Sequence, residues 1–179
     1  MNMKKQWEAW CRRIRCAMNE CSAVALLIGA GALMLCGVIV RGVCGSPYQS
    51  GMMMHFGRVI PPVWLMTLLW MTWYALLGAA FARVMFDRRC DGYTETVKYR
   101  GGMAYLAMLF LGFLWYPIFF CAARPFLGAL IVLGVLILCV ITALCYIKLF
   151  RGVAFLLLCH AAFLVWMLIL NLAMVFYGG

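Results

Sequence analysis

Five long hydrophobic runs, separated by short polar segments, dominate the pattern of the chain. They cover residues 23–40, 61–86, 102–121, 126–147 and 153–176. Each is about as long as the roughly twenty residues that a helix needs to cross a bilayer. The runs are continuous, whereas strands of a membrane barrel alternate apolar and polar residues. The pattern therefore predicts an all-helical bundle of five transmembrane helices, spanning residues 22–179.

Composition supports this prediction. Of the 179 residues, 68% are hydrophobic and 11% are charged, whereas soluble domains are about half apolar and a quarter charged. The mean hydropathy is +1.03. Water is a poor solvent for such a surface, and lipid accepts only helices or closed barrels as spanning structures. We expect a multi-pass integral protein of the cell membrane whose main partner is the lipid bilayer.

The basic residues predict the orientation of the bundle. The net charge is +10, which in a soluble protein would suggest nucleic-acid binding. Here the basic residues lie between the hydrophobic runs, and only Arg41, Arg58 and Arg124 lie in the first and third connections. The positive-inside rule then places the N-terminus and the second and fourth connections in the cytoplasm. The C-terminus is expected outside, and no nucleic-acid partner is expected.

The polar segments add detail to this topology. In residues 1–21, Trp7, Trp10 and Ile14 recur at helical spacing among basic residues. This predicts a basic amphipathic helix on the cytoplasmic membrane surface, with a basic tail lacking fixed structure as the alternative. The segment 87–100 is the most polar part of the chain and is expected outside the membrane.

The sequence carries few groups for catalysis or ion coupling. All five acidic residues lie in the segments expected in the cytoplasm, namely Glu8, Glu20, Asp87, Asp91 and Glu95. Acids buried in the membrane are usual in coupled transporters, so that mechanism is disfavoured. No nucleophile–base pair, phosphate loop or metal motif is present. We therefore expect neither an enzyme nor a metal site.

The ten cysteines do not form a recognisable framework. No CxxC pair and no Cys/His cluster at zinc spacing is present. Most of the cysteines, including Cys36, Cys139 and Cys145 within predicted spans, are expected to fill space as small apolar residues. Cys44 and Cys121 both fall near the predicted outer face, and a bridge between them remains an alternative.

His160 is the one ionisable residue that falls well inside a predicted span. It is expected to be hydrogen-bonded to a neighbour near the cytoplasmic end of the last helix. The alternative is an axial ligand to a haem iron. His55 lies in the first connection and is expected to be solvated.

Aromatic and small residues recur at helical spacing in three of the runs. The stripes consist of Met66, Trp70 and Tyr74, then Gly112, Trp115 and Phe119, and finally Phe163, Met167, Leu170, Asn171 and Met174. Such stripes are more often core packing than a ligand site, and an apolar pocket with few polar groups is the alternative. Small residues at Ala25 and Gly29, and at Gly78 and Ala82, predict close helix contacts.

Three ordered motifs carry a resemblance to a known family. The stretch Pro61-Pro62-Val63-Trp64, with Trp70, Tyr74 and Gly78-Ala79-Ala80, resembles the second-helix signature of the TspO/MBR family. The stretch from Trp115 to Phe120 resembles its W-x-P-x-F-F motif, followed by Ala123-Arg124-Pro125. Leu156-Leu157-Leu158 and Leu170-Asn171 resemble its fifth-helix pattern. The family includes the tryptophan-rich sensory proteins and the translocator protein, or peripheral benzodiazepine receptor.

The resemblance implies a five-helix bundle, usually a homodimer, with a pocket that opens toward the first loop. Family members bind porphyrin and haem, and animal members also bind cholesterol and drug-like ligands. Carried over to this chain, the ligand-binding residues are Trp64, Met66, Trp70, Tyr74, Gly112, Trp115, Phe119, Phe163, Met167, Leu170 and Asn171. No catalytic residue, metal or required cofactor is implied, and porphyrin or haem is the expected ligand.

The chain departs from the family pattern at several pocket positions. Gly112 replaces an asparagine, Cys159-His160 replaces Pro-Tyr, and Phe163 replaces a tryptophan. The expected function is binding of a flat hydrophobic ligand, with sensing, sequestration or passage as the outcome. A facilitator of small amphipathic molecules is the alternative, and light-driven porphyrin breakdown with tryptophans as electron donors is a third.

Overall fold

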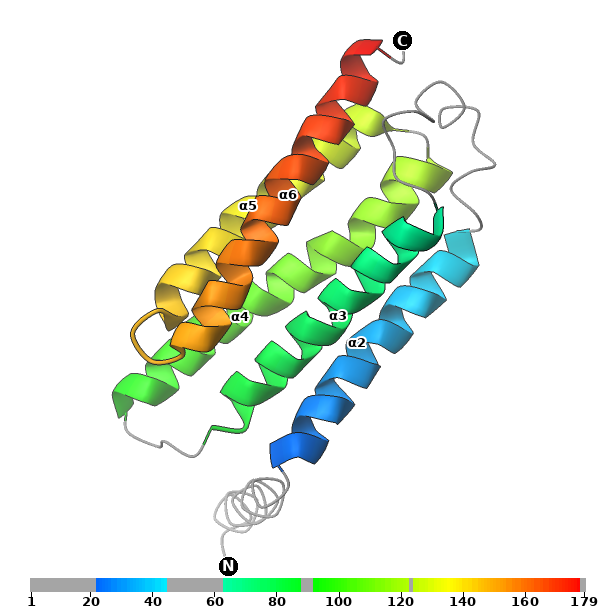
Figure 1. The fold of residues 1–179 in the computed structure, drawn as a ribbon. Helices are drawn as coiled ribbons and strands as arrows, with labels where there is room; N and C mark the ends of the chain where they lie inside the picture. The colour runs from blue at the N-terminus through cyan, green and yellow to red at the C-terminus, as the bar shows by residue number, and fades with distance from the viewer. Residues whose placement is uncertain (1–21, 45–62, 88–91, 123, 178–179) are drawn as a thin grey trace, which may run out of the picture.

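The computed structural model of the chain describes residues 22–44, 63–87, 92–122 and 124–177. Within these ranges the protein is all-helical (Figure 1). The helices are α2 (Ser22–Cys44), α3 (Val63–Met85), α4 (Gly92–Tyr116), the π-helix η3 (Pro117–Cys121), α5 (Pro125–Tyr146) and α6 (Arg151–Tyr177). With η3 continuing α4, five helices in the described part are long and apolar enough to cross a membrane.

The predicted fold class, a five-helix membrane bundle, is therefore confirmed. The orientation of its termini stays a prediction. The predicted surface helix at 1–21 lies outside the described residues.

The polar segment before the third span is helical, which the sequence analysis did not anticipate. The hydrophobic run predicts a span over 102–121, whereas α4 begins at Gly92 and the helix continues to Cys121, over 30 residues. At 1.5 Å per residue this is about 45 Å, longer than the roughly 30 Å hydrocarbon core. Hydropathy marks the part of a helix that suits lipid, whereas helical hydrogen bonding continues into the polar turns.

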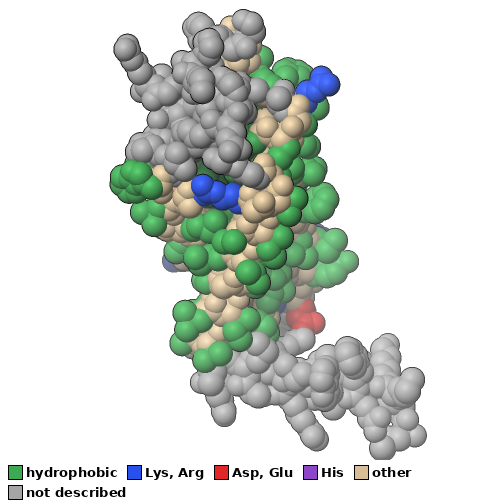
Figure 2. Space-filling view, turned by 90° about the vertical axis from the view of Figure 1, so that its right-hand side faces the viewer, with side chains coloured by type: hydrophobic (Ala, Val, Ile, Leu, Met, Phe, Trp, Pro, Cys, Tyr) green, Lys and Arg blue, Asp and Glu red, His purple; other side chains and the backbone are tan. Residues whose placement is uncertain are grey.

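The helices pack in two groups. α2 lies along α3, and α5 packs against both α4 and α6, while α3 meets α4 and α6 more sparsely (Figure 1). Large apolar side chains such as Leu27, Phe110 and Phe155 point outward from the bundle. Hydrophobic side chains cover most of the described surface on the face in Figure 2, as a surface in contact with lipid requires.

α2 and α3 approach each other closely at two glycines. A Cβ atom on Gly78 would lie 2.1 Å from the carbonyl oxygen of Gly29, and one on Gly29 would lie 2.8 Å from the Cβ of Ala82. Such distances leave no space for a side chain on either glycine. The prediction that small residues mark a close helix contact is confirmed at this crossing.

Hydrogen bonds from a tyrosine and a cysteine link neighbouring helices within the packed core. The Tyr105 hydroxyl on α4 donates to the carbonyl oxygen of Leu77 on α3, at 2.8 Å. The Cys139 thiol on α5 lies 3.1 Å from the carbonyl oxygen of Leu157 on α6. Cys139 is fully buried, as expected of a small apolar filler, and also supplies a donor between helices.

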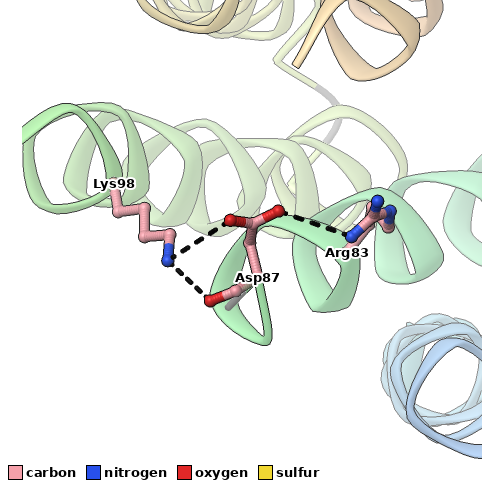
Figure 3. Close-up of polar contacts among 3 residues, drawn as sticks. All are labelled: Arg83, Asp87 and Lys98. Atoms are coloured by element: carbon pink, nitrogen blue, oxygen red, sulfur yellow. Dashed lines mark hydrogen bonds and ion pairs between the residues drawn. The ribbon is translucent and has the colours of Figure 1, made fainter. Parts of the chain in front are cut away.

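Asp87 joins the end of α3 to α4 (Figure 3). Its carboxylate is buried and lies 3.6 Å from Nη1 of Arg83 and 3.9 Å from Nζ of Lys98. The Lys98 ammonium also donates to the Asp87 carbonyl oxygen at 2.8 Å. We refer to this as the Asp87 end of the bundle. The opposite end, where α2 finishes, is the Cys44 end.

Candidate functional site

A small cavity lies between the two helix groups. Its volume is about 30 Å³, enough for water-sized molecules. Its walls come from α3, α4, α5 and α6. The lining residues are Trp70, Trp73, Tyr74, Leu77, Met108, Leu109, Gly112, Trp115, Val132, Val135, His160, Leu164 and Met167. The cavity is thus apolar and rich in aromatic rings, with His160 as its one ionisable side chain apart from Tyr74.

Stacked rings fill the contact between α3 and α4. Trp70 stacks on Trp115 with ring centroids 5.3 Å apart and an interplanar angle of 24°. Tyr74 stacks on Phe113 at 5.0 Å and 23°. Such offset pairs are each worth about 0.5–1.5 kcal/mol beyond the area they bury. Bulky rings hold these two helices apart, whereas glycines bring α2 and α3 together.

A hydrogen bond to α6 fixes the orientation of Trp115 on α4. Its indole Nε1 donates to Oδ1 of Asn171 at 3.2 Å, and the Asn171 amide donates to the Met167 carbonyl oxygen at 2.7 Å. Gly128 on α5 leaves room for this arrangement. A Cβ there would lie 2.7 Å from a Phe119 ring carbon and 3.1 Å from Oδ1 of Asn171. Asn171 therefore orients the tryptophan that forms one wall of the cavity.

The π-helix η3 positions the ring that supports Trp115. Pro117 lacks a backbone N–H and cannot continue the α-helical hydrogen-bond pattern. The Ala122 amide instead donates to the Pro117 carbonyl oxygen at 3.0 Å, which is a π-helical bond. The wider turn places Phe119 in the core, where it stacks on Trp115 at 5.1 Å.

His160 is buried among aromatic rings. It is 4% exposed, its ring centroid lies 4.7 Å from that of Trp73, and it stacks on Phe163 at 6.1 Å. Its Nδ1 atom has no hydrogen-bond partner. Nδ1 does not make the expected hydrogen bond to a neighbour. The rings of Trp73 and Phe163 pack beside the imidazole.

The structure brings together most of the residues that the resemblance implied. Trp70, Tyr74, Gly112, Trp115 and Met167 line the cavity. Phe119, Phe163 and Asn171 contact those rings or His160 from outside the lining.

Of the remaining three implied residues, Trp64 and Leu170 do not line the cavity. Trp64 is 67% exposed, and Leu170 is half-buried beside the core. The side chain of Met66 lies outside the described part.

Several lining residues were missed by the sequence analysis. Trp73 and Leu77 lie four residues apart on α3, so a wider aromatic face would have included them. Val132 and Val135 belong to α5, which is apolar on every face. No signal in the sequence distinguishes the face of α5 that meets the cavity from the face that meets lipid.

A basic residue lies near the Cys44 end of α2. Arg41 is half-buried, and its Nη1 donates to the Thr67 hydroxyl oxygen on α3. Arg58, the other basic residue of the first connection, lies outside the described part. Arg41 thus places a positive charge at the Cys44 end, the side on which the resemblance implies that the pocket opens.

These features define a multi-pass helical membrane protein with an aromatic cavity between its helices. Residues 23–177 match the TspO/MBR family, and the chain belongs to this family. No curated protein and no solved structure matches the chain. Family membership supports a membrane function in ligand binding or transport.

Proposed function

We propose that the protein binds a flat hydrophobic ligand, a porphyrin or haem, between α3 and α4. The observation that carries this proposal is the stacked pair of Trp70 and Trp115 at an apolar, aromatic cavity. Ligand sites are usually apolar clefts with few polar groups, and aromatic faces recognise flat macrocycles by stacking. The binding would serve sensing, sequestration or passage of the ligand.

The size of the cavity implies that the rings separate when a ligand binds. A space of about 30 Å³ is far smaller than the roughly 300–1,000 Å³ of ordinary ligand sites. Separating one stacked pair costs about 0.5–1.5 kcal/mol, and a flat ligand inserted between the rings restores stacking on both faces. The sparse packing of α3 against α4 and α6 favours opening there.

Two polar groups fit the chemistry of a tetrapyrrole. Arg41, near the Cys44 end, would meet the carboxylates at the edge of the macrocycle through charge-assisted hydrogen bonds. At the depth of the cavity, Nδ1 of His160 has no hydrogen-bond partner. With the imidazole proton on Nε2, this atom would be an electron-pair donor that fits an iron ion at the macrocycle centre.

Titration of the full chain in detergent with protoporphyrin IX tests the proposal. We expect saturable tryptophan quenching near one ligand per chain. Trp70→Ala and Trp115→Ala should each weaken binding about tenfold, which corresponds to about 1.4 kcal/mol. Trp64→Ala is the matched control, because Trp64 is on α3 but exposed and away from the cavity. Absence of saturation, or equal binding by all three variants, would refute the proposal.

A further inference from the structure

Two thiols from distant parts of the chain meet at the Cys44 end. Cys44 is the last residue of α2 and Cys121 is the last residue of η3. The Cys121 thiol donates to the Cys44 carbonyl oxygen, with the sulfur 3.5 Å from that oxygen, so the two residues are in direct contact. Both are free, Cys121 is exposed and Cys44 is half-buried. Both are the end residues of their spans, Ala23–Cys44 and Gly92–Cys121, which is the part of a span nearest the aqueous phase.

The other free cysteines of the described residues lie elsewhere. Cys139 is buried and bonded to Leu157, and Cys36, Cys145 and Cys159 are on helix faces within the spans. No hydrogen bond joins any of these four to another thiol among the contacts described. Within the described ranges, a hydrogen bond between two cysteine residues is therefore found at the Cys44 end.

We propose that Cys44 and Cys121 are a disulfide site that controls access to the cavity. The oxidant is a small-molecule or protein disulfide on the side of the membrane predicted to be outside, where disulfides persist. One thiolate attacks the oxidant and releases a thiol, giving a mixed disulfide, which the second thiolate then resolves. The two cysteines lose two protons and two electrons, and the oxidant is reduced to two thiols.

The effect on access follows from which helices the bond would join. α2 belongs with α3, and its contacts with α4 and η3 are sparse. α2 also packs against Tyr74, a residue of the cavity wall, because a Cβ on Gly37 would lie 2.6 Å from the Tyr74 ring. A Cys44–Cys121 bond would tie the α2–α3 pair to the end of α4, across the seam that must open. This part of the inference rests on the proposed function.

Peptide mapping of the full chain tests the disulfide itself. After treatment with oxidised glutathione, we expect a linked pair of peptides containing Cys44 and Cys121, lost on reduction with dithiothreitol. Cys44→Ser and Cys121→Ser should abolish the link, and the control Cys36→Ser should retain it. A map without this link, or with Cys44 joined equally to several cysteines, overturns the proposal.

The rate of protoporphyrin binding tests the effect on access. Oxidised wild-type protein should bind several-fold more slowly than reduced protein, and Cys121→Ser should bind at the same rate under both conditions. Equal rates for linked and reduced wild-type protein overturn the control of access. Failure of the reduced protein to bind porphyrin contradicts the proposed function and the control of access together, while the peptide map decides the disulfide independently.

Discussion

At the residue scale, His160 shows what can be predicted from the sequence and what cannot. Its position inside an apolar run marked it as unusual, and it does line the cavity. Helical spacing, however, places residues on a face of their own helix and says nothing of the neighbouring helix. Phe163, three residues along the same helix, is a neighbour that spacing predicts, whereas the ring of Trp73 and the missing partner of Nδ1 come from tertiary packing.

Replacing His160 separates metal recognition from recognition of the flat ring. In His160→Phe the aromatic packing against Trp73 is retained and the nitrogen is lost. We expect protoporphyrin IX to bind nearly as well as to wild type, while haem loses the absorption spectrum of an imidazole complex. Cys159→Ala, at the exposed neighbouring position, is the control. An unchanged haem spectrum in His160→Phe would show that the histidine does not contact the iron.

The role of Gly128 could not be predicted from the sequence. In Gly128→Ala the new Cβ collides with Phe119 and crowds Asn171. We expect a loss of about 1–3 kcal/mol in unfolding free energy from overpacking, together with altered Trp115 fluorescence. Denaturation in detergent measures both. The control Gly134→Ala places its Cβ 3.6 Å from Leu111, an ordinary contact, and should unfold like wild type.

At the scale of the element, the sequence predicted where helices lie better than which way they face. The hydrophobic runs gave every span, because length and hydropathy depend on the chain alone. The face of α5 that meets the cavity was not predictable, since Val132 and Val135 resemble its lipid-facing residues. The π-helix of η3 was also missed, although Pro117 marked the break in the α-helical pattern.

The crossing of α2 and α3 leaves no space for a side chain on Gly78. In Gly78→Ala the Cβ would lie 2.1 Å from the Gly29 oxygen and 2.9 Å from the Ala30 Cα, so backbone atoms must move. We expect a destabilisation of about 1–3 kcal/mol or more, seen as a lower thermal midpoint in detergent. Gly31→Ala meets no atom within 4 Å and should not be destabilised. Equal midpoints for the two variants would argue against the close crossing.

At the scale of the whole molecule, composition was sufficient for the fold class. A chain with 68% hydrophobic residues in five long runs has few alternatives to a helical bundle in lipid. The site required more, because five of the implied residues meet at the cavity while Trp64 does not. The bounds of the spans follow from local sequence, and the cavity follows from how helices distant in sequence pack together.

The distribution of basic residues makes a prediction for the intact protein in a membrane. Three of the 15 lie in the first and third connections, so the C-terminus should be outside the cytoplasm. A C-terminal reporter that is active only outside the cytoplasm should therefore be active. The same reporter placed within residues 87–100 should be inactive. The reverse pattern would invert the orientation.

The contacts of Asp87 restrict how α3 and α4 can separate. The Lys98–Asp87 ion pair and the Tyr105–Leu77 hydrogen bond join α3 to α4 on one side of the cavity. With a pivot near Leu77, any parting of these helices is a tilt, and the gap widens with distance from the pivot. Thr67 lies about 15 Å and Tyr74 about 5 Å along the helix from Leu77. The gap between the helices at Thr67 must therefore be about three times the gap at Tyr74. A flat ligand would enter with its edge first, from the wide side of this gap.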